Sequence, residues 1–65
     1  MEKIINKIMQ AYEEMYINKY TLQDEEKAEF YKEQYFDLCL DNNVTPRNNK
    51  ILRKRIDDYI DTFNL

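Results

Sequence analysis

The sequence contains no histidine and no glycine, and it has one cysteine and one proline in 65 residues. Without histidine, the chain lacks the imidazole base on which Ser-His-Asp and Cys-His nucleophile systems depend. Without glycine, it cannot form the glycine-rich loops that bind phosphate groups or dinucleotides. One cysteine cannot supply the ligands of a usual zinc site or an internal disulfide. We therefore expect a non-enzymatic protein without a cofactor or a metal site.

Long apolar runs are also missing, and none approaches the roughly 20 residues that span a bilayer. The first residues, Met-Glu-Lys followed by two isoleucines, are too short and too soon polar for a signal peptide. Glu2 stands where N-myristoylation needs glycine, and the final Thr-Phe-Asn-Leu is not a prenylation motif. The expectation is a soluble cytoplasmic protein that does not bind a membrane.

The residues that are present favour a small folded domain. Hydrophobic residues make up 43% of the chain and charged residues 35%, which is too apolar for a disordered tail. A chain of this length forms one domain at most, so residues 1–65 are assigned to a single unit. A core of this size rarely supplies more than about 3–5 kcal/mol of net stability.

Apolar residues recur at helical spacing in three segments, which predicts helices over about residues 2–18, 22–41 and 46–63. Thr21 is the expected N-cap of the second helix, and the Asp41-Asn42-Asn43 run is expected to end it, because asparagine tolerates the left-handed conformation. Thr45 and Pro46 are expected to start the third helix as N-cap and first-turn proline. The predicted core faces are Ile4, Ile5, Ile8, Met9, Tyr12, Met15 and Tyr16; Ala28, Tyr31, Tyr35, Leu38 and Cys39; and Leu52, Ile56, Tyr59, Ile60 and Phe63.

Short connections between these segments imply antiparallel neighbours, so the predicted fold class is all-α, a small antiparallel three-helix bundle. A homodimer is left open. The connection after the first helix lacks both glycine and proline, so one continuous helix through Tyr20 and Thr21 is an alternative that favours a swapped or intertwined dimer.

The second helix carries the first candidate binding surface. Acidic residues recur every four positions and form a ridge along the helix, where like charges disfavour an isolated helix. Phe36 and Leu40 project beside the ridge, and Phe30 lies off the core stripe on another side. Apolar anchors flanked by acids suit the binding of a basic protein surface. The predicted protein-binding residues are Glu29, Glu33, Phe36, Asp37 and Leu40. The alternative is a solvated acidic face whose two apolar residues are covered by the other helices or by a second copy.

The start of the third helix carries the other candidate surface. Residues 1–45 have a net charge of −5 and residues 46–65 a net charge of +2. Residues 38–56 resemble a degenerate helix-turn-helix, with Cys39 as the small residue of its first helix and Asn43 in place of the turn glycine. The motif needs an apolar residue where this chain has Asn49. The DNA-binding residues implied are Arg47, Asn48, Lys50 and Lys54. Against this alternative, the whole chain is acidic, and Arg53 and Lys54 are each followed four residues later by aspartate.

These observations favour a small protein-protein interaction module that regulates or inhibits a larger protein by occupying its surface. Regulators and inhibitors from mobile elements and phages often have this size and charge, an analogy that rests on size alone. The alternatives are a DNA-binding regulator and a subunit of an obligate helical assembly. Cys39 is expected to be a small buried apolar residue rather than a reactive thiol.

Overall fold

The helical periodicity of the sequence becomes three α-helices in the computed structural model, which describes residues 2–63. The helices are α1 (Glu2–Tyr20), α2 (Glu25–Asn42) and α3 (Lys50–Phe63). Residues 2–63 contain no strand. The predicted all-α three-helix fold is therefore confirmed, although the helix boundaries between residues 18 and 50 shift by one to four residues.

A tight reversal separates α1 from α2. The backbone amides of Thr21 and Leu22 both donate to the carbonyl of Ile17 at 2.9 Å, and these bonds close the last turn of α1. Gln23 then adopts a left-handed conformation with φ 54°, which turns the chain back. The alternative of one continuous helix through Tyr20 and Thr21 is therefore wrong, because α1 ends at Tyr20.

The start of α2 lies three residues after the predicted start. Asp24 is the N-cap, and its side chain accepts a hydrogen bond from the backbone amide of Lys27 at 3.1 Å. Thr21, the predicted N-cap, instead belongs to the reversal, where its own amide is used to end α1. Acidic residues still occupy the first turn of α2, where they favour the helix dipole.

The end of α2 falls in the predicted Asp41-Asn42-Asn43 run, and Asn43 is the residue that ends the helix. This residue adopts the left-handed conformation with φ 52° and ψ 41°, and its amide donates to the Leu40 carbonyl at 3.2 Å. The amide of Val44 donates to the Cys39 carbonyl at 3.0 Å, which completes a Schellman motif. Val44 and Cys39 are both buried in the core, so the cap also fixes where the connection leaves the helix.

The third helix begins four residues later than predicted because Thr45 and Asn48 form their own turn. The amide of Thr45 donates to Oδ1 of Asn48 at 2.9 Å, and the amide of Asn48 donates to Oγ1 of Thr45 at 3.3 Å. Pro46 lies inside this turn, outside α3. Asn49 then caps α3 by accepting from the amide of Leu52 at 3.0 Å.

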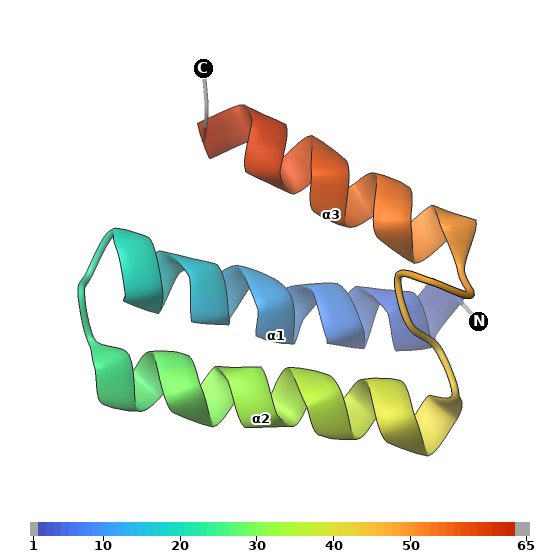
Figure 1. The fold of residues 1–65 in the computed structure, drawn as a ribbon, viewed down its shortest axis with the longest axis horizontal. Helices are drawn as coiled ribbons and strands as arrows, with labels where there is room; N and C mark the ends of the chain where they lie inside the picture. Colours follow the sequence, from blue (N-terminus) through green and yellow to red (C-terminus); the bar gives the residue numbers. More distant parts are fainter. Residues whose placement is uncertain (1, 64–65) are drawn as a thin grey trace.

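The helices form a bent layer with α1 in the middle, flanked by α2 and α3 (Figure 1). α2 runs antiparallel to α1 along its length, whereas α3 meets α1 near residues 43–49 and diverges toward the C-terminus. In the described chain, no Cα atom of α2 lies within 8 Å of one in α3. The molecule measures 30 × 27 × 18 Å, and a width of 27 Å fits three helices side by side at about 8–10 Å spacing.

One core joins the three helices and the connection between α2 and α3. Ile8 and Leu52 have no exposed surface, and the other members are almost as deeply buried. The buried cluster consists of Ile5, Ile8, Met9, Ala11, Tyr35, Cys39, Val44, Leu52 and Ile56. Most of these residues belong to the predicted core faces. Asn18 is also buried, and its side-chain amide donates to the Glu14 carbonyl at 2.7 Å.

Candidate functional site

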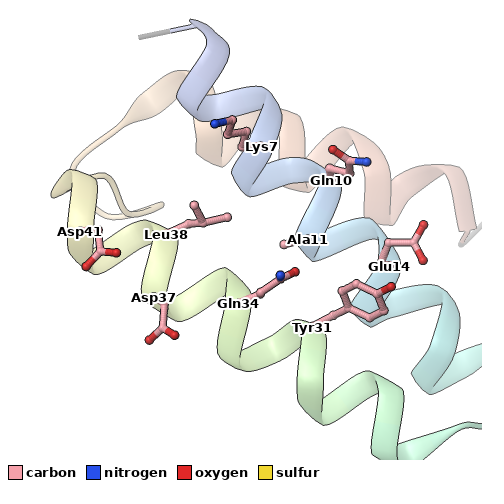
Figure 2. A pocket seen from close by; sticks show the side chains of 9 residues that line it. All are labelled: Lys7, Gln10, Ala11, Glu14, Tyr31, Gln34, Asp37, Leu38 and Asp41. Atoms are coloured by element: carbon pink, nitrogen blue, oxygen red, sulfur yellow. The ribbon is translucent and has the colours of Figure 1, made fainter.

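Two grooves follow the α1–α2 pair. The first, which we call the polar groove, has a volume of about 580 Å³. Ala11 and Leu38 lie between the two helices, while polar side chains surround them (Figure 2). The lining residues are Lys7, Gln10, Ala11, Glu14, Tyr31, Gln34, Asp37, Leu38 and Asp41.

The polar groove offers little that would hold a specific ligand. Asp37 directs its carboxylate away from α1 (Figure 2). Among residues 2–63, no buried side-chain nitrogen or oxygen lacks a hydrogen-bond partner, and no cluster of acids and cysteine has the composition of a metal site. The arrangement is that of a solvated channel between two packed helices.

The second groove, which we call the aromatic groove, has a volume of about 720 Å³. Its apolar lining comes from both helices and is surrounded by charged side chains. The apolar residues are Tyr12, Met15, Ala28, Tyr35 and Phe36, and the charged residues are Lys19, Glu25, Glu26, Glu29 and Lys32. Ring centroids lie 5.5 Å apart for both Tyr12–Tyr35 and Tyr35–Phe36, so the aromatic lining is continuous across α1 and α2.

This aromatic lining continues to α3. The distance between ring centroids is 6.3 Å for Tyr12 and Tyr59. It is 5.0 Å for Tyr59 and Phe63, and 5.1 Å for Tyr16 and Phe63. The Tyr59 hydroxyl donates to the Glu13 carbonyl at 3.4 Å. The ring contacts therefore run from α2 through α1 to α3.

Burial also decides the chemistry of the groups next to the groove. It raises the pKa of the Tyr35 hydroxyl, and the neighbouring Cys39 adds to this effect. Burial raises the pKa of the Cys39 thiol, an effect that its hydrogen bond with Tyr35 partly offsets. Cys39 is thus a buried neutral thiol, as predicted.

The structure divides the predicted protein-binding residues between two sides of α2. Glu29 and Phe36 line the aromatic groove, and Phe36 is 51% exposed. Leu40 lies one turn further along α2 and is 79% exposed, and Glu33 is exposed. Asp37 instead lines the polar groove on the other side. The alternative in which Phe36 and Leu40 are covered by the other helices is therefore wrong, because α3 packs beside α1 and away from α2.

The basic residues lie at the opposite end of the molecule from the α1–α2 reversal (Figure 1). Arg47 and Asn48 belong to the connection and not to α3, whereas Lys50 and Lys54 lie on α3, all four exposed. Residues 43–49 separate α2 from α3, compared with about 3–4 residues in a helix-turn-helix.

The side chain of Asn48 is used within its turn: its amide group accepts from Thr45 and donates to the Asn43 carbonyl at 3.2 Å. Arg53 pairs with Asp57 at 3.8 Å, as expected from their spacing, and Arg55 donates to Asn6. DNA binding remains a prediction, and none of these contacts adds support to it.

Sequence reasoning did not assign Tyr12, Met15 and Ala28 to a binding surface. Their positions predict core residues, and Ala28 is indeed buried, with Tyr12 and Met15 partly so. They line a groove because α3 leaves this side of α1 and α2 uncovered. The hydrophobic pattern of each helix contains no signal for that arrangement.

Comparison of the chain with protein-family models, with curated proteins and with solved structures gave no match. Over residues 2–63, no helix combines the length and the apolar character that crossing a membrane requires.

Proposed function

We propose that this chain is a small, non-enzymatic module of the cytosol that binds a larger protein through the exposed face of α2. One observation carries the proposal: Phe36 and Leu40 are 51% and 79% exposed on a helix whose other exposed side chains are largely acidic. Single exposed apolar residues are common on proteins, but here they stand next to an aromatic groove.

The chemistry of this face suits a protein partner. Half-exposed aromatic side chains provide apolar anchors for a partner protein. The charges around them orient the correct partner and disfavour the binding of other proteins. α2 contains six acidic residues and two lysines, a net charge of −4, which favours a partner with a basic surface. A regulator or inhibitor of this kind acts by occupying the surface that its partner needs for another interaction.

The test compares proteins captured from a host lysate by the wild type and by the double variant Phe36→Ala with Leu40→Ala. We expect the double variant to lose the specific partner while its helical circular dichroism spectrum stays unchanged, because both side chains are exposed. Leu22→Ala with Ile51→Ala is the matched control, since these residues are 64% and 61% exposed and lie outside α2. Capture of the same partner by the Phe36/Leu40 variant would contradict the proposal.

A further inference from the structure

The aromatic groove has the dimensions of a helix-binding site. Its α2 wall extends from Glu25 to Phe36, which corresponds to about 17 Å or three helical turns. Its volume of about 720 Å³ lies in the range of well-formed binding pockets. Peptide helices bind such grooves through apolar residues spaced i, i+3 or i+4, and i+7, a pattern that also covers about two to three turns.

The position of the groove points to the same occupant. In a closed three-helix bundle, the third helix packs against both of the others, in the groove between them. Here α3 lies beside α1, and its Cα atoms stay more than 8 Å from those of α2 throughout residues 2–63. The groove between α1 and α2 therefore presents Tyr12, Met15 and Phe36 where a helix is missing.

The charges beside the groove favour a cationic helix. Glu25, Glu26 and Glu29 lie along the α2 side of the rim, and Lys32 of α2 and Lys19 of α1 also line the groove, so carboxylates outnumber amines by three to two. Lys32 on the same rim is 3.8 Å from Glu29, so its charge is directed toward an acidic neighbour. α2 as a whole has a net charge of −4, but its Asp37 and Asp41 line the polar groove on the other side, so Glu25, Glu26 and Glu29 are the carboxylates of this rim. Lysine or arginine residues flanking the apolar stripe of a bound helix would face these carboxylates.

We infer that the aromatic groove binds one cationic amphipathic helix of the partner protein, which packs on α1 and α2 as an additional helix. This inference rests on the proposed function and specifies the part of the partner that is recognised. Phe36 and Met15 contact the apolar stripe of the incoming helix, and the rim glutamates contact its basic flanks.

A second copy of this chain is a poorer occupant. A two-fold dimer that covers this face brings the same surface patch of both copies together, so it places the acidic residues of α2 opposite each other. Like charges at an interface disfavour association. On a second copy, the surface of complementary charge is the basic start of α3. Among the described residues there, Ile51 is the large apolar side chain that is exposed. One such side chain does not form the apolar stripe that a three-turn groove accommodates.

The experiment titrates the full chain with a synthetic helical peptide of about 14 residues, which spans roughly four turns. Leucines at i, i+3, i+4 and i+7 form its apolar stripe, and lysines flank the stripe. One control peptide replaces the lysines with glutamates, and another has the same composition with the leucines dispersed. Affinity is measured by fluorescence anisotropy and the site is mapped by amide NMR shifts.

We expect the cationic peptide to bind and to shift the amides of Met15, Ala28 and Phe36. Phe36→Ala should weaken binding by about thirtyfold, the scale of a hot-spot residue, whereas Leu22→Ala should leave it unchanged. Binding should also weaken at high salt.

Four results would overturn the inference: no binding, equal binding of the glutamate peptide, shifts confined to the polar groove around Ala11 and Leu38, or a groove already covered by a second copy. Its failure is distinguishable from failure of the proposed function. If the peptide does not bind but partner capture still depends on Phe36 and Leu40, the function stands and the helical occupant is wrong.

Discussion

The tyrosine residues connect the core to the candidate site. Tyr12 and Tyr35 belong to both the core packing and the lining of the aromatic groove, and Tyr59 joins them to α3. Burial raises the pKa of all three hydroxyls. The negative groups near Tyr59, first Glu13 and Glu14, raise its pKa further. Ionisation of these hydroxyls is therefore less favourable in the folded chain than in the unfolded chain.

The raised tyrosine pKa values predict a loss of stability at alkaline pH. In the unfolded chain, tyrosine has a pKa of about 10. Above this pH the unfolded chain releases protons that folded Tyr12, Tyr35 and Tyr59 retain, so the free energy of unfolding falls as pH rises. Below about pH 10 the tyrosine contribution is constant. Urea unfolding followed by circular dichroism between neutral and alkaline pH checks this expectation.

Tyr35→Phe provides the comparison for this measurement, because it removes one of the raised hydroxyls and keeps the ring. Its stability should fall less steeply above about pH 10 than that of the wild type. Equal slopes for the two proteins would show that burial of Tyr35 does not govern the alkaline response.

Helix termini illustrate how local hydrogen bonds position the elements. Asp24, Asn43 and Asn49 each end or begin a helix through a short-range hydrogen bond, in a chain that has no glycine. Because Asn43 provides the left-handed residue after α2, the connection turns directly into the core at Val44. The caps thereby determine which residues of α2 remain outside the core.

Substitution of the N-cap of α2 tests how much a single capping hydrogen bond contributes to stability. Asp24→Ala should lower the free energy of unfolding by about 1 kcal/mol, since it removes the acceptor of the Lys27 amide. Thr21→Ala should have a much smaller effect, because no side-chain bond of Thr21 caps the helix in the structure. Urea denaturation measures the free energy of unfolding of both variants. A larger loss for Thr21→Ala than for Asp24→Ala would contradict the assignment of Asp24 as the N-cap.

The sequence predicts the helices well and their ends less well. Periodicity identifies all three segments and most of the buried residues, because core burial follows directly from the helical repeat. Thr21 and Thr45–Pro46 are both good start signals, yet each belongs to a turn that precedes its helix. A short-range signal does not distinguish a single capped turn from the first turn of a helix, so the boundaries require the tertiary structure.

At the scale of the whole molecule, the position of α3 decides what remains uncovered. Its place beside α1 follows from the length and course of residues 43–49 and from the rings packed between α1 and α3 (Figure 1). Sequence analysis predicts an acidic helix with Phe36 and Leu40 off the core stripe, and both residues are exposed. It does not predict the aromatic groove, because that groove depends on the absence of packing between α2 and α3.

The exposed face of α2 and the aromatic groove can bind a partner only if they are uncovered in the isolated chain. Light scattering behind size-exclusion chromatography, across micromolar concentrations and at two salt levels, measures whether a second copy covers them. We expect a monomer of 8.1 kDa under all these conditions. A species of twice that mass, which Phe36→Ala with Leu40→Ala returns to the monomer, would contradict it and identify this face as the surface of a homodimer.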